Sequence, residues 1–238
     1  MSDHPPLAII AGVGPGLGTA LCKTLGDAGY AVTGISRSRE YTAGLESELK
    51  SRNIPAHMVS CDLTKSDSVR ETFESITQQW GPPDTLIYNA GAIAMHAFAE
   101  TPLDEFDRLW DINCRGAFLC ASQAVPLMQT RGRGSILFTG ASASVKAAAN
   151  FAAFGAGKFA LRGMAQAMAR ELGPQGIHVA HVIIDGMILT PKNQQRAGVT
   201  VDNTLQPDAI AQTYLSLIKQ DRSAWTHELD LRPDVEAF

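Results

Sequence analysis

Short apolar runs alternate with longer amphipathic stretches along the chain, and this alternation constrains the fold more than any other feature. A run such as Leu-Ala-Ile-Ile-Ala is apolar at every position, as in a strand buried on both faces of a parallel sheet. The runs that predict strands are Leu7–Ala11, Ala31–Ser36, Ala56–Ser60, Thr85–Asn89, Ser135–Thr139, Val179–Ile184 and, more weakly, Glu228–Leu231.

The stretches between these runs have the 3.6-residue period of helices that cover a sheet. They are Leu17–Ala28, Glu40–Arg52, Ser66–Trp80, Pro102–Thr130, Asn150–Leu172 and Pro207–Lys219. Thr101 before Pro102 is typical of an N-cap followed by a first-turn proline. Strands that alternate with helices through right-handed crossovers predict an α/β fold. Its core is a Rossmann-type, doubly wound parallel sheet of about seven strands with helices on both faces.

Length and composition exclude several classes of protein. The 238 residues predict a single domain over 1–238, and 45% hydrophobic with 18% charged residues argue against disorder. Twenty basic and twenty-four acidic residues give a net charge of −4, without a dense basic run for nucleic acid. No basic segment precedes the apolar stretch that ends at Val13, which argues against a signal or a membrane span. Widely spaced cysteines without zinc-site spacing predict reduced thiols, no metal and a cytoplasmic location: Cys22, Cys61, Cys114 and Cys120.

A glycine-rich turn follows the first predicted strand directly and opens a helix. Glycine at positions 12, 16 and 18 lets the backbone turn tightly and approach a pyrophosphate, and the helix N-terminus supplies N–H groups. A glycine-rich turn without a ligand is the alternative. Its place after the first strand favours a nucleotide site formed by Gly12, Gly14, Gly16, Leu17 and Gly18.

The end of the second predicted strand indicates which nucleotide this is. Ser36 stands where an acidic residue would bind the ribose 2′-hydroxyl of NAD, and Arg37 and Arg39 follow it. Guanidinium groups pair with a 2′-phosphate, so the sequence predicts NADP(H) rather than NAD(H). The alternative is that these arginines only solvate a loop.

In order and spacing, several motifs together resemble the short-chain dehydrogenase/reductase family over almost the whole chain. They are the turn Gly12–Gly18, Cys61-Asp62-Leu63, Asn89-Ala90-Gly91, Asp111-Ile112-Asn113, a serine segment after the fifth strand, Lys158 on a helix, and Thr190-Pro191. The resemblance implies an NAD(P)-linked oxidoreductase that is often a homodimer or homotetramer. It implies that Asp62 lies by the adenine, that Asn89 steadies the central strand and that Thr190 lies near the nicotinamide. It adds these residues to the cofactor site: Leu63, Ala90, Gly91, Lys158, Asp185 and Gly186.

The family's catalytic pattern is Tyr-x-x-x-Lys, with a serine about a dozen residues earlier. In the family the tyrosine protonates the carbonyl oxygen, the lysine lowers the tyrosine pKa and holds the ribose, and the serine fixes the substrate oxygen. Here Phe154 occupies the tyrosine position and has neither a proton to give nor a hydrogen-bond acceptor. The chain therefore resembles a divergent subgroup that keeps the lysine and carries Phe for Tyr.

Three polar residues remain candidates for the catalytic site. Ser142 lies 12 residues before Phe154, with Ser144 as a second choice; it either holds a substrate oxygen or bonds its own loop. Lys158 shares a helical face with Phe154 and either faces a pocket or extends along the surface to water. In the family, Asn113 supports a water chain to the lysine, although an asparagine can also simply cap or kink a helix.

Other groups could supply the missing proton. His96 follows the fourth strand, at the edge where doubly wound folds bind ligands, and either protonates an alkoxide or is a solvated loop residue. The tyrosines are interpreted as packing residues: Tyr30 and Tyr41 flank the second strand near the adenine end, Tyr88 points away from Asn89, and Tyr214 lies on a late helix.

Asp185 stands before Gly186, where the family more often has Pro-Gly. Its carboxylate could tune a substrate amine, hold a water or bond loop amides, and the sequence does not decide between these. The polar segment 187–206 is predicted to be a substrate lid.

The function predicted is an NADP(H)-dependent oxidoreductase. It would transfer hydride between nicotinamide and a small carbonyl, alcohol, imine or activated alkene, with water or His96 as proton donor. The alternative is an NADP(H)-binding pseudoenzyme that acts as a sensor or scaffold. Apolar residues around much of the two long helical stretches, Pro102–Thr130 and Asn150–Leu172, are consistent with a homodimer or homotetramer.

Overall fold

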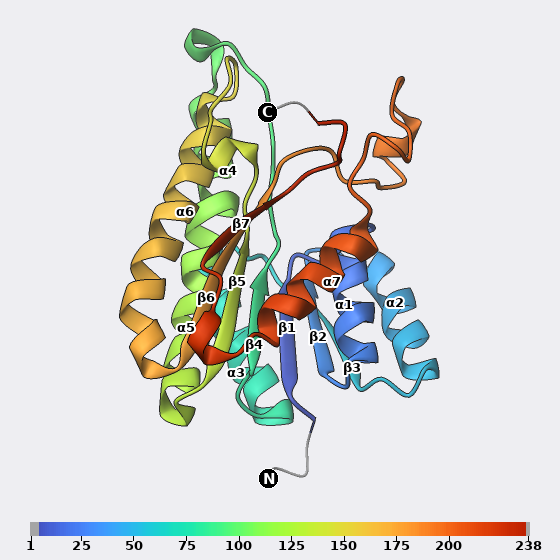
Figure 1. The fold of residues 1–238 in the computed structure, drawn as a ribbon, viewed down its shortest axis with the longest axis vertical. Coiled ribbons are helices and arrows are strands. Elements are labelled where there is room, and N and C mark those ends of the chain that lie inside the picture. Colours follow the sequence, from blue (N-terminus) through green and yellow to red (C-terminus); the bar gives the residue numbers. More distant parts are fainter. Residues whose placement is uncertain (1–4, 237–238) are drawn as a thin grey trace.

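The computed structural model describes residues 5–236, in which seven parallel strands form one sheet (Figure 1). The strand order is β3-β2-β1-β4-β5-β6-β7, so the order reverses between β1 and β4. Carboxyl ends of strands beside such a reversal form the crevice in which doubly wound folds bind ligands. The strands are β1 Leu7–Ala11, β2 Ala31–Ser36, β3 Ala56–Ser60, β4 Thr85–Tyr88, β5 Gly134–Thr139, β6 Ile177–Ile184 and β7 Glu228–Leu231.

Helices cover both faces of the sheet and enclose one apolar core on each face. Side chains of α3, α5 and α6 pack with one face, and those of α1, α2 and α7 pack with the other. The helices are α1 Leu17–Asp27, α2 Arg39–Ser51, α3 Ser66–Trp80, α4 Leu103–Trp110, α5 Gly116–Arg131, α6 Ala152–Leu172 and α7 Pro207–Ile218. Continuous apolar strands are thus buried from both sides, and the predicted doubly wound fold is confirmed.

Two predicted boundaries are corrected. The helix predicted to begin after an N-cap at Thr101 begins one residue later: Pro102 is the N-cap, and the Thr101 hydroxyl donates to the carbonyl of Ala97. The single stretch predicted over Pro102–Thr130 is α4 and α5 joined by a π-helical turn, Asp111–Arg115.

Tyr88 accounts for that wide turn. Its hydroxyl donates to the carbonyl oxygen of Ile112 (2.7 Å). A Cβ atom at Gly116 would lie 2.4 Å from the Tyr88 oxygen, so glycine lets the tyrosine approach the helix backbone closely. The prediction that Tyr88 is a packing residue on the face opposite to Asn89 agrees with its place in the core formed by α3, α5 and α6.

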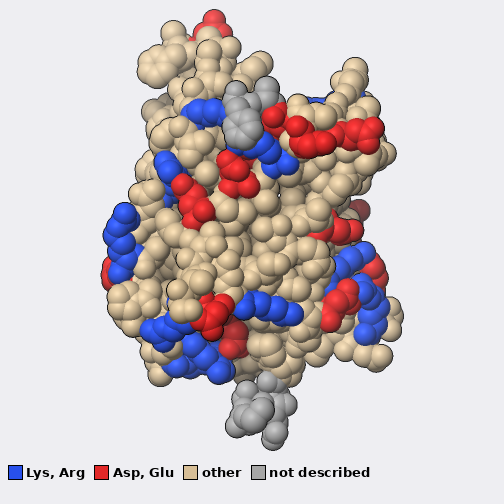
Figure 2. Space-filling view, viewed as in Figure 1, with Lys and Arg blue, Asp and Glu red and all other residues tan. Residues whose placement is uncertain are grey.

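The opposite edge of the sheet corrects another expectation. Tyr30 is not near the adenine end, because it precedes β2 and therefore lies at the amino edge, in a pocket with Asp84 and Thr85. In the view of Figure 2, Lys and Arg side chains lie among Asp and Glu side chains. Within residues 5–236, no helix is both long and apolar enough to cross a membrane.

Candidate functional site

The glycine turn lies at the carboxyl end of β1, against the loop that follows β4. A Cβ atom at Gly12 would lie 2.3 Å from the backbone nitrogen of Ala90, and one at Gly18 would lie 2.6 Å from the Gly12 carbonyl oxygen. Gly14, by contrast, faces open space, with no atom of the described chain within 4 Å of its would-be Cβ. The turn therefore packs tightly against the protein on one side and is open on the other.

A chain of hydrogen bonds fixes this turn from behind. The Tyr214 hydroxyl on α7 shares a bond with the Thr139 hydroxyl (2.8 Å), and the Thr139 hydroxyl donates to Asn89 Oδ1 (3.2 Å). Asn89 Nδ2 then donates to the Gly12 carbonyl oxygen (2.8 Å). Because Thr139 has one hydroxyl hydrogen and donates it to Asn89, Tyr214 must be the donor of the first bond.

The carboxyl ends of β2 and β3 carry the residues expected around an adenosine. The Ser36 hydroxyl donates to the Ser38 carbonyl oxygen (2.6 Å), and the Arg37 side chain is exposed beside it. Asp62 accepts from the backbone N–H and the hydroxyl of Thr64, and these bonds help to hold its pKa below the usual value. Leu63, which follows Asp62, is buried in the core.

Lys158 lies on α6 with only 5% of its surface exposed, which excludes the alternative of a surface lysine. Its ammonium group donates to the carbonyl oxygen of Thr139 (2.9 Å) at the end of β5. Burial lowers the pKa of Lys158 to about 8, because the charged form loses hydration there. A Cβ atom at Gly91 would lie 3.6 Å from the Lys158 nitrogen, so this amine lies directly behind the loop after β4.

Asn113 holds the same loop from the π-helical turn. Its Nδ2 donates to the Ala92 carbonyl oxygen (2.8 Å) and its Oδ1 accepts from the Ala92 N–H (3.2 Å). The side chain is fully buried. Asn113 therefore fixes the backbone beside Gly91 and Lys158, and both of its polar atoms have protein partners.

Phe154 stands on α6 one turn before Lys158 and is half-buried. Its ring contacts Phe151 edge to face, with ring centres 6.5 Å apart. The site thus has an aromatic surface at the position where the family pattern has a phenol.

The two candidate serines have different partners. Ser144 is fully buried, and its hydroxyl accepts from the backbone N–H of Ala141 (3.1 Å), which is the loop-bonding alternative. Ser142 instead donates its hydroxyl hydrogen to Oδ1 of Asp185. Oδ2 of Asp185 lies 3.2 Å from Arg232 Nη2 and 3.5 Å from Lys146 Nζ. This partner was not among the roles predicted for Asp185: the structure shows a carboxylate that accepts a hydrogen bond from Ser142.

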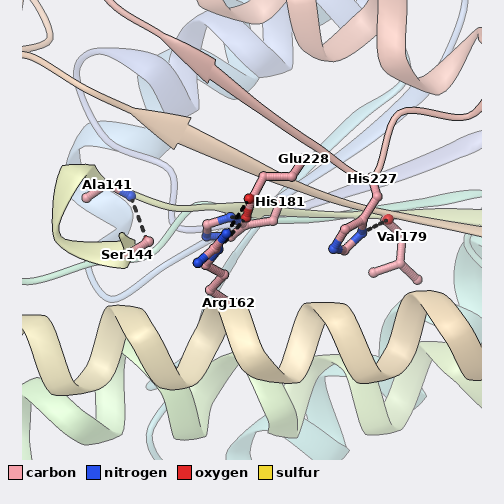
Figure 3. A network of polar contacts seen from close by, with 7 residues as sticks. All are labelled: Ala141, Ser144, Arg162, Val179, His181, His227 and Glu228. Carbon is pink, nitrogen blue, oxygen red and sulfur yellow. Dashed lines mark hydrogen bonds and ion pairs between the residues drawn. The ribbon is translucent and has the colours of Figure 1, made fainter. Parts of the chain in front are cut away.

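A half-buried polar cluster attaches β7 to β6 and α6 (Figure 3). Glu228 on β7 accepts two hydrogen bonds from Arg162 on α6, both 2.7 Å, and one from His181 Nδ1 on β6 (3.0 Å). Burial lowers the pKa of His181 to about 4, so its ring is neutral and Nδ1 carries the hydrogen that Glu228 accepts. The cluster fixes β7, whose continuation brings Arg232 to Asp185.

His96 lies in the outer part of the loop after β4. Its backbone N–H donates to the Asn150 carbonyl oxygen (2.9 Å), and its ring is near enough to Glu105 to assist Arg108 in lowering the pKa of that carboxyl group. The structure therefore groups Ser142 with Asp185, and Lys158 with Asn113, whereas His96 is grouped with α4.

The predicted lid, 187–206, is mostly irregular and crosses the start of α1. The Thr190 methyl group is 2.8 Å from a would-be Cβ at Gly16, and the Thr190 hydroxyl accepts from the Asn193 N–H (3.1 Å). A pocket lies between this segment and α1, lined among others by Thr19, Lys23 and Gln194.

Lys146, Arg232 and the His181 cluster did not emerge from the sequence. Lys146 follows Ser142 by four residues, and this spacing could have drawn attention to it. Arg232 is distant in sequence from both Ser142 and Asp185, and only the pairing of β6 with β7 brings it to them. No local pattern reveals a partner of that kind.

Comparisons with known proteins agree with this geometry. A family model described as short chain dehydrogenase matches residues 6–198. An NADPH-dependent pterin aldehyde reductase of Arabidopsis thaliana is 33% identical over 165 residues, which are 69% of this chain and 68% of that protein. A crystal structure of a short-chain dehydrogenase from Rhodopseudomonas palustris has a TM-score of 0.85 and 32% identity, covering 96% of this chain and 98% of the other. A metagenomic short-chain oxidoreductase in complex with NADP has a TM-score of 0.85 and 25% identity, covering 97% and 98%.

Proposed function

Because the chain belongs to the short-chain dehydrogenase family, we propose that it is an NADP(H)-dependent oxidoreductase. It transfers hydride between the nicotinamide and a small carbonyl, alcohol, imine or activated alkene. The observation that carries this proposal is the buried Lys158, a cation kept at low dielectric beside Gly91 and Thr139. Burying an ammonium group is costly unless it is paired and hydrogen-bonded, and buried ionisable groups with shifted pKa values cluster at functional sites.

The glycine turn fits a dinucleotide. Its tight side leaves no space for a side chain at Gly12, while its other side is open at Gly14. Within residues 5–236, no side chain caps the first turn of α1 at Gly16. The Thr19 N–H donates to the Gly14 carbonyl oxygen (3.3 Å), and the N–H groups of Leu17 and Gly18 remain available to a pyrophosphate. The residues that would line the dinucleotide there are Gly12, Gly14, Gly16, Leu17, Gly18, Asn89, Ala90 and Gly91.

NADP(H) is favoured by the end of β2. Arg37 is exposed beside Ser36, which stands at the position where an acidic side chain would repel a 2′-phosphate. Asp62 and Leu63 would lie by the adenine, and Gly186 and Thr190 on the nicotinamide side. The NADP bound to the metagenomic relative and the NADPH dependence of the Arabidopsis relative support this choice.

In this proposal Lys158 bonds the ribose hydroxyls of the bound cofactor, which supplies or accepts the hydride. Phe154 closes one side of the substrate pocket with an apolar surface and excludes water. Asn113 keeps the loop at Gly91 in place, and the segment 187–206 covers the substrate.

Exposed aromatic side chains suggest that a second copy of the chain covers part of α5 and α6. Phe118 on α5 is 58% exposed and Phe159 on α6 is 43% exposed. A homodimer or homotetramer built on these helices would bury both rings.

Phe154 also favours a second candidate, a pseudoenzyme that binds NADP(H) as a sensor or scaffold. The two functions are separated by a substrate screen that follows NADPH oxidation. Turnover that Lys158→Ala abolishes, in a variant that remains folded, establishes the enzyme and excludes the pseudoenzyme. NADPH binding without turnover of any carbonyl, imine or activated alkene establishes the second candidate.

A further inference from the structure

The hydrogen bond from Ser142 to Asp185 determines what the serine can offer a substrate. The Asp185 carboxylate is ionised, since the bond from Ser142, assisted by the charges of Lys146 and Arg232, lowers its pKa. An ionised carboxylate only accepts, so the single hydroxyl hydrogen of Ser142 is the one in this bond. Toward any other molecule, Ser142 Oγ presents lone pairs.

The carboxylate is held from several sides and keeps this orientation. Asp185 follows β6, and its backbone N–H donates to the Leu231 carbonyl oxygen (2.8 Å). Arg232 is 3.2 Å from Oδ2 and is itself paired with Asp230 at 2.7 Å. The Asp185 side chain is only 7% exposed. The surrounding structure therefore fixes the direction in which the Ser142 hydroxyl donates its hydrogen.

Phe154 stands where the family pattern has the tyrosine that protonates a developing oxyanion. Hydride addition to a ketone creates an alkoxide, which needs a proton or strong hydrogen-bond donors. The Ser142 hydroxyl already donates its hydrogen to Asp185, and the Phe154 side chain has no hydrogen-bond donor. Hydride addition to an iminium ion is different, because the nitrogen charge is cancelled and the product is a neutral amine.

We propose that the substrate of this site is a protonated imine, whose N–H donates to Ser142 Oγ, and that Asp185 is the specificity-determining residue that turns the serine into an acceptor. This inference rests on the proposed function and narrows its substrate class. The iminium carbon accepts a hydride with its electron pair from the reduced nicotinamide and forms a C–H bond. The π pair of the C=N bond moves onto nitrogen, the oxidised nicotinamide and the amine leave, and the step consumes no proton.

The charges around the carboxylate define the recognition further. Asp185 faces the cations Lys146 and Arg232, and Asp230 pairs with Arg232, so these four side chains of the described residues carry no net charge together. Attraction to positive charge alone is therefore weak. The acceptor direction of Ser142 selects an N–H group, and an N-methylated iminium ion, which has the charge without the N–H, is a poor substrate.

The test compares matched substrates of the wild-type chain in the presence of NADPH. Pyrroline is compared with cyclopentanone, and dihydroisoquinoline with tetralone and with N-methyl-dihydroisoquinolinium, by the rate of NADPH oxidation. The inference predicts that kcat/KM for each imine exceeds that for its ketone by about tenfold or more, the effect of one well-placed hydrogen bond to a charged donor. The N-methylated ion is expected to lose about the same factor.

Variants assign the preference to Asp185. Asp185→Asn can donate from its amide to Ser142 Oγ and so frees the serine hydrogen, which lowers imine kcat/KM and raises ketone kcat/KM. Ser142→Ala lowers imine kcat/KM without the gain for ketones. Asp67→Asn, which removes an exposed carboxylate on α3, far in the chain from Ser142 and Asp185, keeps the wild-type preference. Binding of the amine pyrrolidine to the NADPH complex, followed by NADPH fluorescence, weakens in Asp185→Asn and gives a readout independent of turnover.

The outcomes separate this inference from the proposed function. NADPH binding with ketones turned over as well as imines, or with no imine turned over at all, overturns the inference and leaves the NADP(H) site standing. A selectivity that Asp185→Asn does not shift also overturns it. A folded chain that does not bind NADPH overturns the proposed function and the inference together.

Discussion

The two halves of the sheet's carboxyl edge differ in what holds them together. Around β1, β2 and β3 the geometry depends mainly on the backbone: glycines packed against main-chain atoms and an asparagine that bonds the Gly12 carbonyl oxygen. Around β5, β6 and β7 it depends on charged side chains, with Asp185, Arg232 and Glu228 linking strands and loops. A site built from backbone atoms suits a ligand whose structure is constant, such as a nucleotide. Charged side chains can instead orient a neighbouring hydroxyl group, as Asp185 orients that of Ser142. The first half is therefore suited to holding a nucleotide, and the second half determines the chemistry.

The largest effect on stability and on NADPH binding is expected from a substitution at Gly12, in the half around β1, β2 and β3. This residue has a φ of 106°, and a Cβ atom would lie 2.3 Å from the nitrogen of Ala90. Gly12→Ala should lower the free energy of unfolding by about 3 kcal/mol or more and abolish NADPH binding. Thermal or urea unfolding and calorimetry measure the two effects.

Gly14→Ala is the matched control within the same turn. Its Cβ would meet no atom of the described chain within 4 Å, so its stability should stay within about 0.5 kcal/mol of wild type. NADPH affinity should fall, because the methyl group enters the open side of the turn. Equal destabilisation by both substitutions would contradict the division into a packed and an open side.

The Phe154→Tyr variant tests the half around β5, β6 and β7 by placing a phenol at position 154. A positioned acid contributes about 10²–10⁴-fold, so ketone kcat/KM should rise by a factor in that range. Imine turnover should change little, since an iminium ion needs no acid. Phe151→Tyr adds a hydroxyl to the neighbouring ring of the aromatic pair and serves as the control. A folded, NADPH-binding Phe154→Tyr protein without any gain on ketones argues against the missing-acid explanation.

Lys158 lies between the two halves. Its ionisation is expected to have a smaller, pH-dependent effect on the free energy of unfolding. Its pKa is about 8 in the folded protein and 10.5 for an unperturbed lysine, so between these values the unfolded chain binds more protons. The stability of the cofactor-free protein should therefore rise with pH through this window. The lysine's contribution to that rise is at most about 3 kcal/mol.

Lys158→Met removes this ionisation. The difference in unfolding free energy between wild type and variant should shift in favour of the variant as the pH falls from about 10.5 to about 8, and should level off on either side of that window. Denaturant titrations at several pH values measure it. A difference that does not vary with pH would mean that the amine is not desolvated as the structure indicates.

The sequence predicted correctly those features in which one local requirement, such as burial or a tight backbone turn, selects the residue type. The apolar runs and the glycine turn predicted the strand positions and the doubly wound sheet, because burial on two faces leaves a local pattern. It placed Thr101 and Tyr30 incorrectly, since an N-cap shifts by one residue and a tyrosine before a strand belongs to its amino end. The bond from Ser142 to Asp185 could not be predicted, because Arg232 and Lys146 orient the carboxylate from a different strand and a different loop.

The most direct test of the account is a calorimetric titration of the wild-type chain with NADPH and with NADH. We expect one site per chain and a Kd for NADPH at least about tenfold lower than the Kd for NADH, because a cation pairs with the 2′-phosphate. Arg37→Ala should remove that preference by weakening NADPH alone, whereas Arg70→Ala, an exposed arginine on α3, should leave it intact. A folded wild-type chain that binds neither nucleotide, or binds NADH more tightly, would contradict it.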